Sequence, residues 1–285
     1  MKILGSGKAN GAISILHAVG IGKGCSVGIQ LETKVQIVDE PNKVNGDMHR
    51  LLDSVEYFWR KEGLPIPDEF GWQVESTIPI GQGLKSSSAL SCAAFRALNS
   101  CSWTGLSNSE IADLAAKSQI MSKCAITGSM DDNWAALEPG WKLVDPTMGA
   151  SESIIIQGKM DESLSVLVCL RGERSLEISP KRFLEQRQIF ERALASIMSG
   201  SPLDSLSSNG MAVSAATDDH QALRISNLCI ASGSIASGIS GSGPAIAIVC
   251  FEDDAESISA IIEEMGLLTI QTRFASSIAT VEEVA

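Results

Sequence analysis

The sequence predicts an α+β fold in two parts. Helical and strand-like stretches follow one another irregularly along the 285 residues, without the repeated strand–helix–strand units of a doubly wound parallel sheet. Apolar residues make up 44% and charged residues 20%, as in folded proteins with a sizeable core. This length favours one or two domains that share an interface, and we place the boundary between residues 1–155 and 156–285.

Hydrophobic periodicity predicts the individual elements. Stretches that combine apolar residues at helical spacing with few helix breakers are expected to be helices: 47–61, 86–98, 107–123, 180–198, 209–231 (as a pair) and 255–265. Alternating or short apolar stretches are expected to be strands: 29–37, 72–78, 143–144, 153–156, 164–170, 245–251 and 269–273. Loops are expected at 12–28 and 200–208, because Gly or Ser is frequent there. Ser107 and Glu110 have the spacing of a capping box.

Charge and composition exclude several kinds of partner. The net charge of −12 argues against binding to nucleic acid, which requires clustered Lys and Arg, although one local pocket can still bind ATP. Seven scattered cysteines without a CxxC pair indicate reduced thiols, and three distant histidines give no metal-ligand spacing.

No apolar run approaches the length of a membrane span, and no leader is recognisable at Met1, so we expect a cytoplasmic protein. The oligomeric state stays open.

One glycine- and serine-rich run, which follows a predicted strand and opens a predicted helix, suits the binding of a triphosphate. Its glycines let backbone N–H groups approach an anion, and the helix N-terminus adds positive partial charge. Its lysine can neutralise a phosphate, and its hydroxyls can bind phosphate or Mg²⁺. An ordinary glycine turn with serine caps is the alternative. The run consists of Pro79, Ile80, Gly81, Gln82, Gly83, Leu84, Lys85, Ser86, Ser87, Ser88 and Ala89.

This run resembles the second signature of the GHMP kinases, and the sequence of residues 83–89 is similar to the corresponding segment of the archaeal shikimate kinases. Two other segments occur in the order of that family: residues 7–29 resemble its N-terminal signature, and residues 238–245 resemble its C-terminal glycine loop. Each flanking match is weak alone. Gly5, Gly7 and Gly11 have a dinucleotide-like spacing after a very short lead-in, and residues 240–244 fit a simple turn.

The resemblance implies a fold, a reaction and its cofactors. The fold is an N-terminal ATP-binding domain like domain 2 of ribosomal protein S5, followed by a ferredoxin-like C-terminal domain. The reaction is phosphorylation of the 3-hydroxyl of shikimate by ATP with Mg²⁺, on the route to chorismate and the aromatic amino acids. The alternatives are a homoserine or mevalonate kinase of the same family, or a non-catalytic relative that only binds ligands.

The resemblance also assigns catalytic residues. The glycine-x-x-Asp element at 128–131 makes Asp131 the base, with Asp132 directly behind it, and Lys8 is expected within a few ångströms of Asp131. Two acids at a helix start also simply complement the helix dipole, and Lys8 also fits a solvated position.

Metal and substrate contacts follow in the same way. Ser87 is the expected Mg²⁺ ligand. In the helix before Asp131, where several relatives have a magnesium-binding Glu, this chain has the sequence Lys117-Ser118-Gln119-Ile120. The acidic metal ligand is therefore unassigned. Lys23 and Arg96 are candidates for binding the substrate carboxylate. The other expected substrate contacts are Asn10, Gly241, Ser242 and Gly243.

Overall fold

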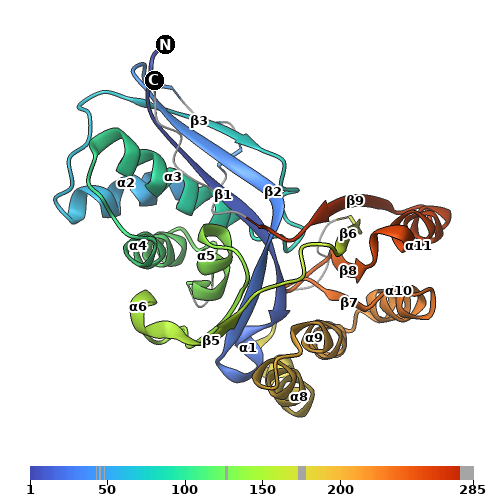
Figure 1. Cartoon of the computed structure of the whole chain (residues 1–285). Helices are drawn as coiled ribbons and strands as arrows, with labels where there is room; N and C mark the ends of the chain where they lie inside the picture. Colours follow the sequence, from blue (N-terminus) through green and yellow to red (C-terminus); the bar gives the residue numbers. More distant parts are fainter. Residues whose placement is uncertain (43, 45, 48, 126–127, 173–177, 277–285) are drawn as a thin grey trace.

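The structure, a computed structural model, describes residues 1–42, 44, 46–47, 49–125, 128–172 and 178–276. It contains a five-stranded and a four-stranded sheet, each packed against helices (Figure 1). All strand pairs in these residues are antiparallel, which confirms the α+β prediction. The described part contains no helix long and apolar enough to cross a membrane.

The first sheet is organised around two long strands that pair along most of their length. Ser14 lies opposite Ser26 near one end of this pair, and Lys8 lies opposite Lys34 further along. On its other edge, β2 pairs with β4 near its start and with β3 near its end. The strands are β1 (Ile3–Leu16), β2 (Gly24–Val38), β3 (Gly71–Ser76), β4 (Trp141–Val144) and β5 (Ile154–Gly158).

Helix α3 packs closely on β1 because two glycines of that strand have no side chain. A Cβ on Gly5 would lie 2.5 Å from the carbonyl oxygen of Ala97, and a Cβ on Gly7 would lie 2.4 Å from that of Ala93. These glycines therefore belong to a helix–strand contact and not to a dinucleotide loop. The helices of this half are α1 (Ala18–Ile21), α2 (Leu51–Lys61), α3 (Ser86–Ser102), α4 (Asn108–Met121), α5 (Met130–Leu137) and α6 (Ala150–Ser153).

The second sheet has the strand order β7-β8-β6-β9, with β9 reaching back toward the first sheet through a bridge between Ile29 and Phe274. Its strands are β6 (Ser165–Leu170), β7 (Ala236–Ile239), β8 (Ile246–Cys250) and β9 (Leu268–Arg273). The helices of this half are α7 (Pro180–Glu185), α8 (Arg187–Met198), α9 (Pro202–Thr217), α10 (His220–Ala231) and α11 (Glu252–Glu264).

Most predicted elements are confirmed, including the capping box at Ser107, but five details differ. Residues 12–16 continue β1, residues 24–28 begin β2, and the short strand β7 was not predicted. The expected loop at 200–208 is mostly helix, because Pro202 takes the first position of α9, where the missing N–H costs nothing. The expected helix 180–198 is divided at Gln186.

The domain boundary at residues 155 and 156 stays a prediction. β5 pairs with β4 in the first sheet as far as Gly158, and the second sheet begins with β6 at Ser165. The important consequence for the site is that segments of both halves meet next to the start of α3.

Candidate active site

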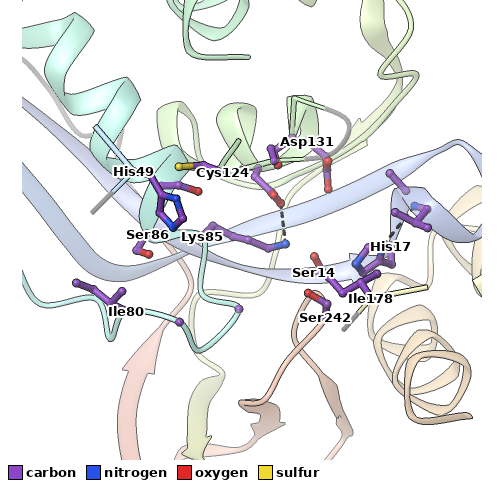
Figure 2. A pocket seen from close by; sticks show the side chains of 18 residues that line it. Ser14, His17, His49, Ile80, Lys85, Ser86, Cys124, Asp131, Ile178 and Ser242 are labelled. Carbon is purple, nitrogen blue, oxygen red and sulfur yellow. Dashed lines mark hydrogen bonds and ion pairs between the residues drawn. The ribbon is translucent and has the colours of Figure 1, made fainter. Parts of the chain in front are cut away.

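A cavity of about 370 Å³ lies where β1, the start of α3, the start of α5 and a loop of the second half converge (Figure 2). Its size is within the range of small-molecule sites. The lining residues are Ser14, His17, Ala18, Val19, His49, Ile80, Gly81, Gly83, Lys85, Ser86, Ser87, Cys124, Ala125, Ser129, Asp131, Asp132, Ile178 and Ser242.

The loop of residues 79–85 brings the N-terminus of α3 to this cavity. Gly81 and Gly83 have φ values of +75° and +78°, and Lys85 adopts a left-handed conformation directly before the helix. A Cβ on Gly83 would lie 2.3 Å from the carbonyl oxygen of Ser240, so only glycine fits. The first turn of α3 contains no acidic residue, and its N–H groups have no intrahelical partners. This geometry favours the binding of an anion.

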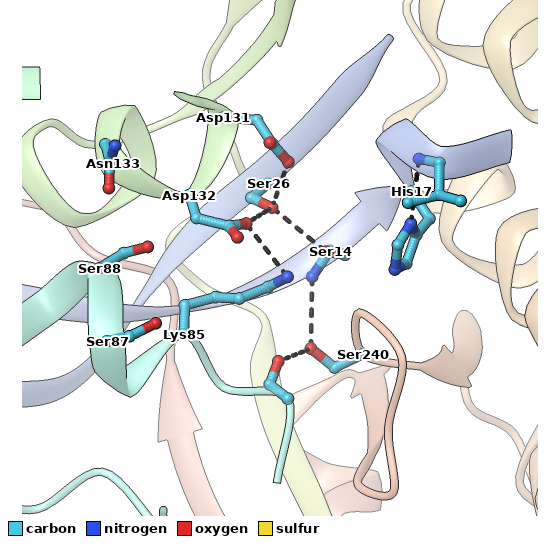
Figure 3. Close-up of polar contacts among 12 residues, drawn as sticks. Ser14, His17, Ser26, Lys85, Ser87, Ser88, Asp131, Asp132, Asn133 and Ser240 are labelled. Carbon is cyan, nitrogen blue, oxygen red and sulfur yellow. Dashed lines mark hydrogen bonds and ion pairs between the residues drawn. The ribbon is translucent and has the colours of Figure 1, made fainter. Parts of the chain in front are cut away.

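Two neighbouring carboxylates, Asp131 and Asp132, lie on the first turn of α5 and are only 5% and 6% exposed. The hydroxyl of Ser26 lies 2.9 Å from Oδ2 of Asp131 and 2.7 Å from Oδ1 of Asp132, and it can donate to one of them at a time. The Nζ of Lys85 lies 3.1 Å from Oδ1 of Asp132 (Figure 3). The carboxylates, a hydroxyl and an ammonium therefore form one cluster beside the start of α3.

The environment of Asp131 suits a general base. Burial, followed by the charge of Asp132, raises the pKa of Asp131 to about 7, although Lys85 and the Ser26 hydrogen bond act in the opposite direction. A carboxylate with a pKa near neutrality accepts a proton more readily than an ordinary aspartate and is still available in its ionised form.

The loop of residues 240–244 closes the cavity from the second half of the chain. The hydroxyl of Ser240 donates to the carbonyl oxygen of Gly83 at 2.8 Å and accepts from the backbone N–H of Ser14 at 3.3 Å. A Cβ on Gly241 would lie 2.8 Å from the Nζ of Lys85. Arg171 stabilises the end of this loop, because its Nε donates to the carbonyl oxygen of Pro244 at 2.8 Å.

Eight of the seventeen predicted site residues line this cavity. Ser242 and Asp131 line it, and Gly241 and Gly243 flank Ser242. In the phosphate-loop run, the lining residues are Ile80, Gly81, Gly83, Lys85, Ser86 and Ser87. Pro79, Gln82, Leu84, Ser88 and Ala89 do not line the cavity. Two of them fix the loop, since the carbonyl of Leu84 accepts from Ala12 and the amide of Gln82 donates to Gly172.

Lys8 and Asn10, two of the predicted site residues, do not line this cavity. Lys8 lies six residues before Ser14 on β1, roughly 20 Å at the rise of a strand, and its ammonium is 3.7 Å from Glu32. Lys85 occupies the position next to the carboxylates that the sequence assigned to Lys8. Asn10 is buried opposite Glu32 and does not line the cavity.

The two candidates for a carboxylate-binding cation also lie elsewhere. Lys23 pairs with Asp145 at 2.7 Å. Arg96 is 3% exposed and donates to the carbonyl oxygens of Lys8 and Leu137, so it joins β1 to α5. Neither lines the cavity.

Sequence reasoning missed several residues of the site, above all Ser14, Ser26 and His17. Ser14 and Ser26 are cross-strand partners whose hydroxyls are 3.3 Å apart, and both are buried in otherwise apolar stretches. Buried polar residues in an apolar strand were the available signal. The ring of His17 packs against Phe183 at 4.8 Å, while its Nδ1 accepts from the backbone N–H of Val19.

The donors in the cavity fit Mg²⁺, which prefers oxygen ligands and keeps several waters. The hydroxyl of Ser87 and the carboxylates of Asp131 and Asp132 are such donors. No group of three His, Cys, Asp or Glu within the described ranges could hold a metal by itself. Phosphate oxygens and water would therefore supply the remaining ligands.

Comparison with known proteins agrees with this geometry. Residues 49–140 match the N-terminal domain of the GHMP kinases. The chain is 28% identical to the shikimate kinase of Pyrococcus furiosus, over 92% of this chain and 96% of that protein. It is also 28% identical to the shikimate kinase of Methanobrevibacter smithii, over 87% of this chain and 88% of that protein.

Solved structures show the same fold at low sequence identity. The mevalonate kinase of Methanococcus jannaschii superposes with a TM-score of 0.73 at 13% identity, over 95% of this chain and 98% of that one. A putative homoserine kinase of Listeria monocytogenes gives a TM-score of 0.69 at 16% identity, over 97% and 98%. Residues 49–140 thus resemble the N-terminal domain of the GHMP kinases, and the relatives along most of the chain support an ATP-dependent kinase. The solved structures show the shared fold.

Proposed function

We propose that this chain is a shikimate kinase, which transfers the γ-phosphoryl group of ATP to the 3-hydroxyl of shikimate and releases ADP. The observation that carries the proposal is the match to archaeal shikimate kinases over most of both chains. The site supports it chemically, because a helix N-terminus, an ammonium and a carboxylate of raised pKa share one cavity.

In the proposed reaction, Asp131 accepts the proton of the acceptor hydroxyl as its oxygen bonds to the γ-phosphorus. The bond between this phosphorus and the oxygen that bridges it to the β-phosphate breaks, and its electron pair leaves with ADP. Lys85 and the N–H groups of the first turn of α3 stabilise the negative charge on the transferring group. Bound Mg²⁺ would neutralise phosphate charge, with Ser87 as its protein ligand.

A second cavity of about 270 Å³, adjacent to the first, indicates where the base of the nucleotide would bind. Its wall is largely apolar and includes Val44, Leu51, Val74 and Leu90, which suits a nucleobase. The residues shared by both cavities are His49, Ile80, Ser86, Ser87 and Cys124. We place the base there, so that the phosphates cross the start of α3 toward Asp131.

The choice of shikimate as acceptor rests on the relatives and not on the cavity. Shikimate, homoserine and mevalonate all carry a carboxylate, so one cation in the cavity cannot discriminate among them. Solved mevalonate and homoserine kinases share the fold. These acceptors are therefore the necessary comparison.

The test is a coupled ADP-release assay with Mg-ATP and a panel of shikimate, homoserine, mevalonate and galactose, with each product identified by mass. We expect the kcat/KM for shikimate to exceed that of every other acceptor by about a thousandfold, because wrong acceptors leave buried polar groups unpaired. Preference for another acceptor would refute shikimate and leave the kinase assignment intact. Binding of ATP without turnover of any acceptor would favour a ligand-binding relative.

A further inference from the structure

A buried carboxamide connects the start of α3 with α5. Gln119 lies near the end of α4 and is 0% exposed. Its Oε1 accepts from the hydroxyl of Ser88 at 3.1 Å and from that of Ser87 at 3.4 Å. Its Nε2 donates to Oδ1 of Asn133 at 2.6 Å. One side chain therefore contacts both the phosphate-binding helix and the helix that bears the carboxylates.

The neighbours of Asn133 determine which way this carboxamide points. The Nδ2 of Asn133 donates to the backbone carbonyl oxygens of Ala112 and Gly128, at 3.3 and 3.2 Å. Carbonyl oxygens only accept hydrogen bonds, so Asn133 must direct its NH₂ group at them and its oxygen at Gln119. Gln119 must then direct its own NH₂ group at Asn133 and its oxygen at the serines.

The orientation of Gln119 in turn determines the orientation of the Ser87 hydroxyl. A hydroxyl has one proton to donate and two lone pairs that accept. Because the amide oxygen of Gln119 carries no proton, the proton of Ser87 points to Gln119. Ser87 lines the cavity, so its lone pairs are the part of the hydroxyl that faces the ligand. Lone pairs bind a metal ion, whereas a phosphate oxygen would require the proton.

We propose that Gln119 is a positioning residue, which directs the Ser87 proton away from the cavity and thereby makes Ser87 a ligand of the Mg²⁺ in bound Mg-ATP. This inference rests on the proposed function in one respect, namely that the cavity receives Mg-ATP. A Glu at position 119 could not act in the same way, since an ionised carboxylate has no proton to donate to Asn133.

The test measures nucleotide binding by calorimetry without an acceptor, once with Mg-ATP and once with ATP in EDTA. Gln119→Leu should weaken the binding of Mg-ATP by about tenfold or more, a usual effect for a residue that orients a metal ligand, while metal-free ATP changes by less than about threefold. Ser118→Ala is the control. Ser118 is buried on the same helix and does not line the cavity; its hydroxyl lies 2.9 Å from the carbonyl oxygen of Leu114 and 3.4 Å from that of Ser54.

Ser87→Ala extends the test and does not depend on how well the Gln119 variant folds. It should lose affinity for Mg-ATP and keep its affinity for metal-free ATP. The double variant should bind Mg-ATP within about twofold of the weaker single variant, because both changes remove the same ligand.

Three results would overturn the inference. Equal weakening of Mg-ATP and metal-free ATP by Ser87→Ala would show that the proton faces phosphate. Additive losses in the double variant would show that Gln119 does not act through Ser87. A wild-type protein that binds neither form of ATP would refute the proposed function and this inference together.

Discussion

The ammonium of Lys85 lies 3.1 Å from Oδ1 of Asp132 and joins the residue directly before α3 to the first turn of α5. This ion pair is largely buried, with side-chain exposures of 13% and 9%. Lys85 therefore lies between the proposed phosphate site and the proposed base. Removing its charge should change both the binding of the nucleotide and the pKa of Asp131.

Lys85→Met should weaken the binding of Mg-ATP by about tenfold or more, because a buried charge partner of the phosphates is lost. It should also move the midpoint of the pH profile of kcat/KM to higher pH, since Lys85 lowers the pKa of Asp131. Steady-state kinetics between pH 5 and 9 measure both effects. Lys8→Met is the matched control and should change neither by more than about twofold. A larger effect at Lys8 would contradict the placement of these two lysines.

Asp131→Asn should lower kcat by about a hundredfold or more and leave the affinity for Mg-ATP nearly unchanged, as expected for loss of a positioned base. Asp132→Asn should affect kcat less, because Asp132 is the partner of Lys85 and not the proposed base. Single-turnover kinetics with calorimetric binding separate the two effects. If Asp132→Asn is the more damaging change, Asp132 is the base.

The raised pKa of Asp131 also predicts the pH dependence of activity. Below pH 7 the carboxyl is largely protonated and cannot accept a proton, so kcat/KM should fall about tenfold per pH unit on the acid side. Above pH 7 the profile should level off. A profile that is flat down to pH 5 would contradict Asp131 as the base.

The same pKa predicts an effect on stability. Between about pH 4 and pH 7 the unfolded chain ionises Asp131 while the folded chain keeps it protonated, so ionisation makes folding less favourable as the pH rises. Asp131→Asn should therefore be more stable than the wild type at pH 8, by at most about 4 kcal/mol, and the difference should shrink toward pH 4. Urea unfolding at several pH values measures it. A variant that is less stable than the wild type at pH 8 would contradict this assignment.

Arg171 offers a test of how the loop of residues 240–244 is held within the second half. It donates to both carboxylate oxygens of Asp219 and to the carbonyl oxygen of Pro244, and its side chain is only 5% exposed. Arg171→Met should destabilise the fold by about 3 kcal/mol or more, because it leaves a partly buried carboxylate unpaired. Arg187→Met, which removes an exposed pair with Glu191, should cost less than about 1 kcal/mol. Equal effects in urea unfolding would contradict a special role of Arg171.

The sequence predicted those parts of the site that are local along the chain. The glycine-rich approach to α3, the serines of its first turn and the two acids that begin α5 are each encoded within a few residues, and the structure brings them together. Local chemistry was sufficient there, because a helix N-terminus has the same properties wherever it is placed.

The parts that were missed depend on which strands pair and in what register. Nothing near Lys8 or Lys85 reveals which ammonium reaches the carboxylates; the pairing of Ser14 with Ser26 and the left-handed backbone at Lys85 determine it. The orientation of Gln119 depends on Asn133 and on two backbone carbonyls, which three separate segments of the chain supply. Such relationships arise only when the chain is folded.

Gly5 and Gly7 show that a residue can be indispensable without any chemistry of its own. Any side chain at these positions would collide with the backbone of α3 at 2.4–2.5 Å, and this helix carries Lys85 and Ser87 at its start. A complete mutational scan should therefore find both glycines as intolerant as the carboxylates, although neither lines the cavity. The glycines at the beginning of this chain, which resemble a ligand-binding signature, are therefore explained by the close packing of α3 on β1.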